Sequence, residues 1–206
     1  MKTSVATACS TGTRLFHACL ALAVISQLIS SQFMQVPQEG RPGNWVFDVH
    51  EYSGLFAGAM ALGLWLVIIT RIGGTDIGRL LPWFSADRRA AFWADTKAHW
   101  TIVRAFHLPQ YRQASPFSAA IHGLGLLLIT AMAATGTLYW LGNIAGSQDG
   151  LVIWLAINLH GLMANLVWAY LIGHAGMALI HHFTGGQSLR VMWATSPTTS
   201  SKEPSK

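Results

Sequence analysis

Four long apolar stretches dominate this chain and restrict it to a narrow set of folds. A helix needs about 20 apolar residues to cross a hydrocarbon core of about 30 Å, and all four stretches reach that length. None contains an internal proline, so each can satisfy its own backbone hydrogen bonds in lipid. The stretches cover residues 13–33, 47–72, 117–141 and 151–183. We predict an all-α integral membrane protein built as a four-helix bundle.

Composition supports a membrane domain and excludes an ordinary soluble one. The chain is 52% hydrophobic and only 10% charged, whereas a soluble domain carries about 25% charged residues. We therefore predict one membrane domain over residues 1–193 and a polar tail over residues 194–206. The first stretch is expected to remain as a membrane span, because no convincing small-residue cleavage site follows it.

The basic residues predict how the chain is oriented. Twelve of the 13 Lys and Arg residues lie on one side: at or before the start of the first span, from the end of the second span to the start of the third, or after the fourth. Only Arg41 lies on the other side. Because cytoplasmic connections carry the excess of Lys and Arg, we predict that both termini are cytoplasmic. The net charge of +5 is accounted for by this distribution, and nucleic acid is not an expected partner.

The long connection over residues 73–115 is predicted to be cytoplasmic. It mixes arginines with aromatic residues such as Trp93 and Trp100. This mixture is typical of amphipathic pieces that lie on a membrane surface. A partly ordered linker is the alternative interpretation of the same segment.

Histidines inside the spans are the residues that indicate a cofactor-binding function. Five of the nine lie in the interior of the spans, where ionisable side chains are costly and usually functional, and His181 and His182 lie at the inner boundary of the fourth. The five are His17, His50, His122, His160 and His174. A neutral imidazole is a common axial ligand of haem iron. The sequence contains no Cys-x-x-Cys-His motif, so any haem is held by coordination alone.

Spacing sorts four of these histidines into two pairs. His160 and His174 are 14 residues apart, which is about 21 Å along a helix and close to a whole number of turns. They therefore share one helix face at two membrane depths. His50 matches the depth of His160 near the outer surface, and His17 matches His174 near the inner surface. We predict two b-type haems, ligated by His50 with His160 and by His17 with His174.

Other residues have less specific predicted roles around these pairs. His122 lies near the inner end of the third span, where it could replace His17 as a ligand, bond a haem propionate or contact a quinone. Four arginines are candidate propionate partners through charge-assisted hydrogen bonds: Arg14, Arg71, Arg112 and Arg190. An ordinary topology-setting charge is the alternative for each of them.

The fourth span gives the chain a family resemblance. His160-x-x-x-Ala164-Asn165 is followed by Ile172-Gly173-His174-Ala175, and then by Ala178-Leu179-Ile180-His181-His182-Phe183. This pattern resembles the bacterial cytochrome b561 and nickel-hydrogenase di-haem cytochrome b family, and also the cytochrome b subunits of formate dehydrogenases. In that family the two histidines of the fourth helix ligate different haems, with partners on the first and second helices. The resemblance implies the same pairing that depth alone predicts.

The resemblance also implies a function and partners. It implies a multi-pass protein of the bacterial cytoplasmic (inner) membrane that moves electrons between a periplasmic redox partner and membrane ubiquinone or menaquinone. Before the third span, however, the chain reads Gln113-Ala114-Ser115-Pro116, where related hydrogenase and dehydrogenase subunits tend to have an Asn-containing turn near their quinone site. Whether the chain is a quinone-linked oxidoreductase itself therefore stays open.

Two further functions remain alternatives at this stage. One is an anchor and relay subunit of a dehydrogenase or hydrogenase that has no quinone site of its own. The other is a haem-free transporter with histidines as a proton relay, although broken helices and inverted repeats, which are typical of transporters, are not evident. The sequence also leaves a homodimer open.

Overall fold

A computed structural model of the chain describes residues 10–38, 40–70, 76–109, 112, 115–147, 150–184 and 189. Four of its helices are long and apolar enough to cross a membrane. They are α1 (Thr11–Ser30), α2 (Trp45–Thr70), α5 (Pro116–Ile144) and α6 (Leu151–Phe183). The predicted all-helical fold with four candidate spans is confirmed.

Two helix ends differ from the approximate span limits by about one turn. The first helix ends at Ser30 instead of residue 33, and Ser31 to Phe33 form a turn. The Ser31 hydroxyl donates to the carbonyl of Leu28, and such a side-chain bond competes with continuation of a helix. The third span continues to Ile144, three residues beyond the prediction. The predicted tail, residues 194–206, lies outside the described residues.

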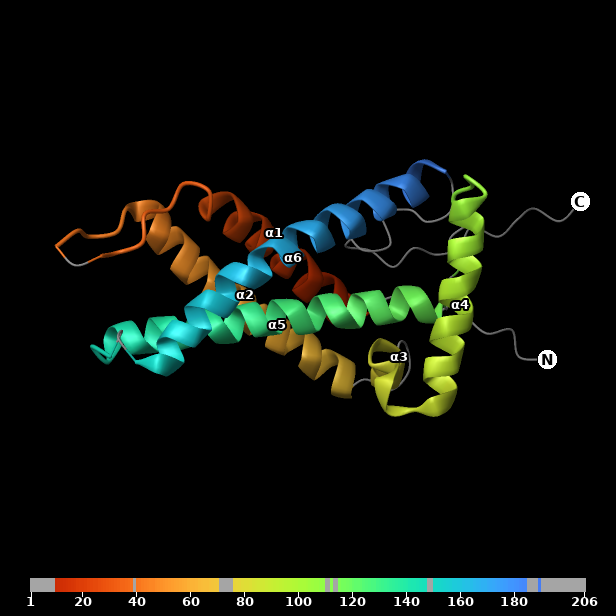
Figure 1. Cartoon of the computed structure of the whole chain (residues 1–206), viewed down its shortest axis with the longest axis horizontal. Helices are drawn as coiled ribbons and strands as arrows, with labels where there is room; N and C mark the ends of the chain where they lie inside the picture. The colour runs from red at the N-terminus through yellow and green to blue at the C-terminus, as the bar shows by residue number, and fades with distance from the viewer. Residues whose placement is uncertain are drawn as a thin grey trace, which may run out of the picture.

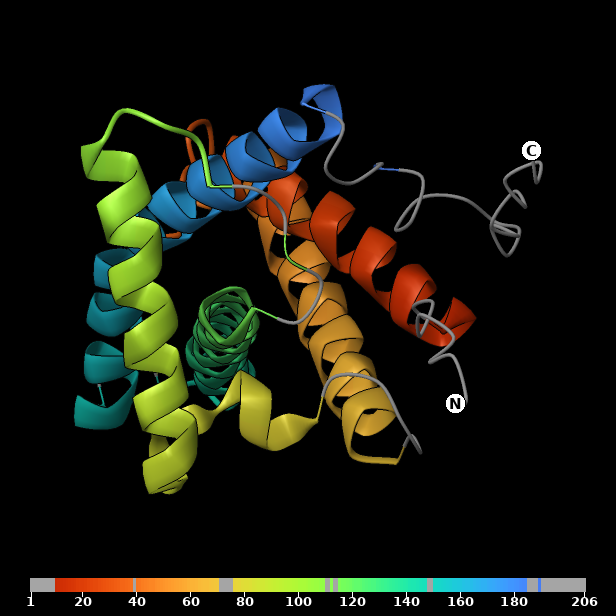
Figure 2. The ribbon, with the colours of Figure 1, turned by 90° about the vertical axis from the view of Figure 1, so that its right-hand side faces the viewer.

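The four long helices form a bundle with two distinct ends (Figure 1). The loop end holds the connection from α1 to α2 and the turn from α5 to α6. The α4 end holds the start of α1, the end of α2, the start of α5 and the end of α6. There α4 (Ala86–Arg104) crosses the bundle, with α3 (Ile77–Leu80) and the short 3-10 helix η1 (Pro82–Phe84) beside it (Figures 1 and 2).

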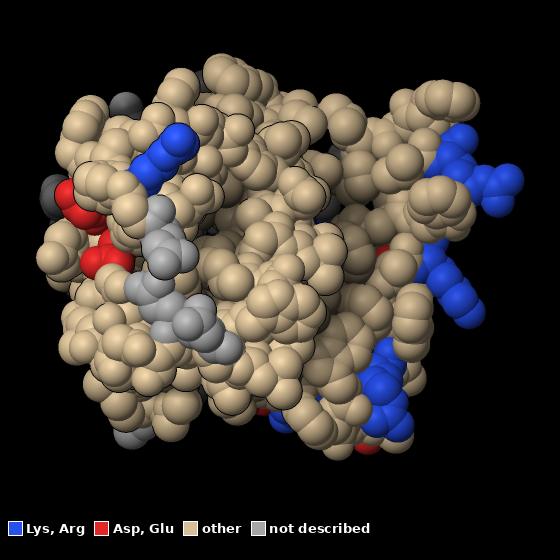
Figure 3. Space-filling model, turned by 60° about the vertical axis from the view of Figure 1, so that its left-hand side comes forward, with Lys and Arg blue, Asp and Glu red and all other residues tan. Residues whose placement is uncertain are grey.

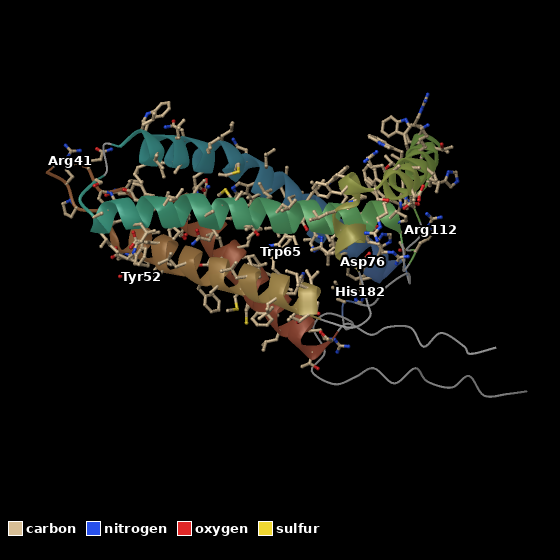
Figure 4. All side chains as sticks on the ribbon, turned by 90° about the horizontal axis from the view of Figure 1, so that it is seen from below. Arg41, Tyr52, Trp65, Asp76, Arg112 and His182 are labelled. Carbon is tan, nitrogen blue, oxygen red and sulfur yellow. The ribbon has the colours of Figure 1, made fainter. Side chains whose placement is uncertain are left out.

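The core lies where α1, α2 and α5 meet. Buried apolar residues from these helices and from α6 form one cluster, which includes Leu20, Val24, Ala61, Ile129 and Val167. A Cβ at Gly58 of α2 would lie 3.2 Å from the Cβ of Ala133 on α5, so this glycine permits a close approach of the two helices. Trp65 of α2 donates to the Thr130 hydroxyl of α5 at 3.0 Å (Figure 4).

The surface of the bundle suits a hydrocarbon environment. Large apolar side chains on the spans are widely exposed, among them Leu62, Leu66 and Leu162. Figure 3 shows a broad face with few charged side chains, and Lys and Arg gather mainly at its right-hand edge. Exposed apolar area on this scale indicates contact with lipid.

Among the described residues between α2 and α5, α4 packs on its neighbours through specific contacts. Ser85 begins α4 by accepting a bond from the Arg88 backbone N–H, and Phe92 buries its ring against Trp83 and Phe117. Residues 86–104 of the long connection form one helix of 19 residues.

Asp95 fastens α4 to the start of α5. Its buried carboxylate accepts bonds from the Ser115 hydroxyl at 2.5 Å and from the Phe117 backbone N–H at 3.1 Å, and it pairs with the Arg112 guanidinium. Ser115 is also the N-cap of α5, accepting from Ser118 N–H at 3.1 Å. One carboxylate therefore stabilises the α4–α5 corner and the first turn of a spanning helix.

Replacing Asp95 with alanine should destabilise the protein by about 2 kcal/mol, because a buried hydrogen-bonding cluster around a charged group loses its common acceptor. Thermal unfolding in detergent, followed by circular dichroism, measures the effect. Asp87→Ala is the matched control, since Asp87 is an exposed acid on the same helix. Equal stability of the two variants would contradict this role of Asp95.

Candidate functional site

The loop end brings together one histidine from α2 and one from α6. His50 lies in the second turn of α2, and His160 lies ten residues into α6. Their ring centroids are 6.2 Å apart, with the ring planes at 76°. Both side chains are half-buried. We refer to these two residues as the loop-end pair.

The α4 end brings together one histidine from α1 and one from α6. His17 and His174 have ring centroids 6.2 Å apart, with the planes at 54°. Both side chains are again half-buried. These two residues form the α4-end pair, so α6 contributes one imidazole to each pair.

Both pairs have the spacing that an axially ligated iron requires. A metal–imidazole bond is about 2 Å long, and the ring centroid lies about 1 Å beyond the nitrogen, so two imidazoles on opposite sides of one metal have centroids about 6 Å apart. A pair of imidazoles packed face to face would be closer. The equal separations of 6.2 Å therefore fit haem iron at both ends.

The surroundings of α6 also leave room beside these histidines. This helix packs chiefly on α5 rather than on α1 or α2. A Cβ added at Gly161 or Gly173, next to the two histidines of α6, would meet nothing within 4 Å. The imidazoles thus face each other from helices that are not packed tightly together, as a flat macrocycle between helices requires.

Hydrogen bonds determine the tautomer of His160. Its Nδ1 lies 3.1 Å from the carbonyl oxygen of Met132 and 3.0 Å from Oγ1 of Thr135. A carbonyl can only accept, so Nδ1 carries the proton. The Nε2 atom is therefore the nitrogen whose lone pair is available for a metal.

Hydrogen bonds also select the tautomer of His50. Its Nδ1 lies 3.1 Å from the Ser30 hydroxyl oxygen, and the single proton of that hydroxyl is directed at the carbonyl of Ser26 at 2.7 Å. Ser30 therefore accepts from the Nδ1–H of His50, which leaves Nε2 for a metal. Gln27 of α1 donates to the backbone carbonyl of His50 and to the Ser53 hydroxyl, and so joins α1 to α2 beside this pair.

Two more aromatic side chains surround His174. The ring of His122, from α5, lies 5.2 Å from it with the planes at 84°. The ring of Tyr170 stacks on it at 5.4 Å and 11°. Gly125 on α5 makes space for Tyr170, because a Cβ there would lie 2.0 Å from the tyrosine ring. His122 is thus adjacent to the α4-end pair, and its side chain is exposed.

The candidate arginines lie in different settings. Arg14 is buried on α1, three residues before His17 and so on the same side of the helix. Arg112 pairs with Asp95 at the corner between α4 and α5 (Figure 4). Arg71 and Arg190 lie outside the described residues.

Comparison with known proteins agrees with this geometry. The family model described as prokaryotic cytochrome b561 matches residues 8–194, which is nearly the whole chain. The chain belongs to the prokaryotic cytochrome b561 family. No curated protein and no solved structure gives a significant match.

Membership of the cytochrome b561 family supplies the coarse function. Its members bind haem b, so this cytochrome b561 is a multi-pass bacterial membrane protein of transmembrane electron transfer. The matched region contains both histidine pairs and His122, together with the α4 segment.

Sequence reasoning missed several residues that surround the two pairs. No sequence pattern marks these residues, because serine, threonine and tyrosine are ordinary residues of membrane helices. They are Ser30, Thr135 and Tyr170. Ser30 lies 20 positions from His50, and Thr135 lies 25 positions from His160. Only the packing of different helices brings them together.

Proposed function

We propose that this cytochrome b561 transfers electrons across the membrane through two b-type haems. His50 and His160 ligate the haem at the loop end, and His17 and His174 ligate the haem at the α4 end. The observation that supports this most strongly is the same 6.2 Å centroid separation in both pairs, on two levels of α6 that are 14 residues apart.

The protein residues supply position, ligands and an apolar environment. Haem iron provides the one-electron redox chemistry when it is bound. The Nδ1–H bonds of His50 and His160 hold each imidazole in the tautomer that leaves Nε2 for a metal. Apolar helices on either side exclude water, and buried Arg14 is the described arginine best placed to neutralise a propionate at the α4 end.

The unequal distribution of Lys and Arg between the two ends of the bundle supports one orientation of the protein in the membrane. Arg41 lies at the loop end, whereas Arg112 lies at the α4 end (Figure 4), together with the exposed Arg88, Arg89 and Lys97 of α4. By the positive-inside rule the α4 end faces the cytoplasm. The loop end then faces the periplasm, where a soluble redox protein or a dehydrogenase or hydrogenase subunit would exchange electrons with the protein.

A quinone is the proposed partner within the membrane. His122 supports this proposal, because its exposed imidazole lies beside the α4-end pair and can bond a quinone carbonyl. Reduction of the purified protein by a short-chain ubiquinol or menaquinol analogue tests this step. A haem-loaded protein that neither quinol reduces, and that neither quinone oxidises, would instead be a relay subunit.

The haem content is tested directly. The protein is purified in detergent, reduced with dithionite and measured by visible spectroscopy and as the pyridine haemochrome, with protein quantified by amino-acid analysis. We expect b-type absorption and two haems per chain. A single haem per chain would refute the two-haem arrangement, and a colourless protein would favour the transporter alternative.

A further inference from the structure

Ser30 and Thr135 contact the two loop-end imidazoles from two other helices. Ser30 is the last residue of α1, and Thr135 lies in the second half of α5. Each hydroxyl directs its own proton at a backbone carbonyl of its own helix, Ser26 at 2.7 Å and Ala131 at 2.9 Å. Each oxygen is therefore left as an acceptor for an imidazole Nδ1–H.

These hydrogen bonds fix the rotation of each imidazole ring about the bond that its Nε2 would form to a metal. An imidazole bound through Nε2 can rotate about the metal–nitrogen bond, and a hydrogen bond at Nδ1 selects one orientation. Because the two acceptors lie on different helices, the two rings are fixed independently. The resulting angle between the ring planes is 76° at the loop end, compared with 54° at the α4 end.

We propose that Ser30 and Thr135 are positioning residues that hold the loop-end imidazoles in crossed planes and tune the electronic state of the haem between them. This inference rests on the proposed ligation by His50 and His160. Neither hydroxyl touches the iron; both act through the ligand to which they are bonded.

Crossed imidazole planes have a specific spectroscopic consequence. In low-spin ferric haem, near-perpendicular axial ligand planes bring two iron d orbitals close in energy, which gives an electron paramagnetic resonance signal with strongly anisotropic g-values. We expect the loop-end haem to show the larger maximum g-value of the two. A hydrogen bond accepted from Nδ1–H also makes the imidazole a stronger donor, which favours ferric iron.

The test uses full-length holoprotein in detergent and the variants Ser30→Ala and Thr135→Val. The loop-end signal is first identified as the one missing from a His160→Ala variant. In each hydroxyl variant we expect the maximum g-value of this signal to fall, because a ring that loses its hydroxyl contact can turn toward its partner's plane. The fall should be smaller in Thr135→Val, because the Met132 carbonyl at 3.1 Å still accepts from Nδ1–H of His160. We also expect the midpoint potential of the same haem to rise, while the α4-end haem keeps its signal and its potential.

Matched controls separate positioning from general packing. The Ser31 hydroxyl donates to the carbonyl of Leu28, and the Thr130 hydroxyl accepts from Trp65. Ser31→Ala and Thr130→Val therefore remove similar groups from the residue that follows α1 and from α5. Neither control should move the loop-end signal. Thr135→Ser keeps a hydroxyl and should retain the native g-values and potential.

The possible outcomes distinguish this inference from the proposed function. If the protein binds two haems and both hydroxyl variants leave the loop-end g-values and potential unchanged, the positioning role is refuted and the ligand assignment stands. If His160→Ala removes no haem, the ligand assignment itself fails. If Thr135→Val loses the loop-end haem, retention by Thr135→Ser supports the inference, whereas loss in both overturns it.

Discussion

Replacing His160 with alanine should remove one of two haems and leave the other in place. The substitution deletes one of the two proposed ligands of the loop-end haem, and the haem, which has no covalent attachment, is then held through His50 alone and much more weakly. The α4-end pair lies on another level of α6 and shares no ligand with the loop-end pair. Haem per chain should therefore fall by about half, without loss of the folded protein.

The measurement is the pyridine haemochrome of the purified variant, with circular dichroism to show that helix content is unchanged. His182→Ala is the matched control, because His182 is an exposed histidine on the same helix, and it should retain both haems. A His160→Ala protein that keeps its full haem content would exclude this residue as a required ligand. Loss of both haems would show that the two sites are not independent.

The four spans could be predicted because length and apolar content are properties of a continuous segment. The position of α4 could not be predicted in the same way. Its sequence mixes alanines, arginines and aromatic residues, and whether such a segment folds depends on contacts with other parts of the chain. Those contacts are the bond from Ser115 to the Asp95 carboxylate and the ring of Phe92 against Phe117, and they join residues 20 or more positions apart.

The pairing of the histidines could be predicted from the sequence, whereas the contacts of the residues around them could not. The depth of a residue in a membrane helix follows from its distance to the helix end, so depth predicts which histidines lie at the same level. The direction of a side chain also depends on how each helix is rotated about its axis, which a single sequence does not specify. The contacts of Ser30, Thr135 and Tyr170 depend on that rotation, and so does the ion pair of Arg112 with Asp95.

The rotation of each helix about its axis also decides whether His17 or His122 lies opposite His174. The sequence leaves His122 as an alternative ligand at that level. The centroids of His122 and His174 are 5.2 Å apart at 84°, which is closer than two imidazoles on opposite sides of one metal, whereas His17 and His174 are at 6.2 Å. The geometry therefore favours His17 as the ligand. We expect His17→Ala to lose the α4-end haem and His122→Ala to retain both haems.

His17→Ala and His122→Ala should also differ in their spectra, and the spectra distinguish the two ligand assignments better than haem content alone. His122→Ala removes an imidazole that touches His174, so the α4-end haem should keep its b-type bands but change its midpoint potential, and any quinone reaction at this end should slow. His17→Ala should leave only the loop-end signal. The opposite pattern, with the α4-end haem lost from His122→Ala and kept in His17→Ala, would reassign the ligand to α5. That result would also require α5 rather than α1 to hold the second haem, and Arg14 would then lose its proposed role beside the propionates.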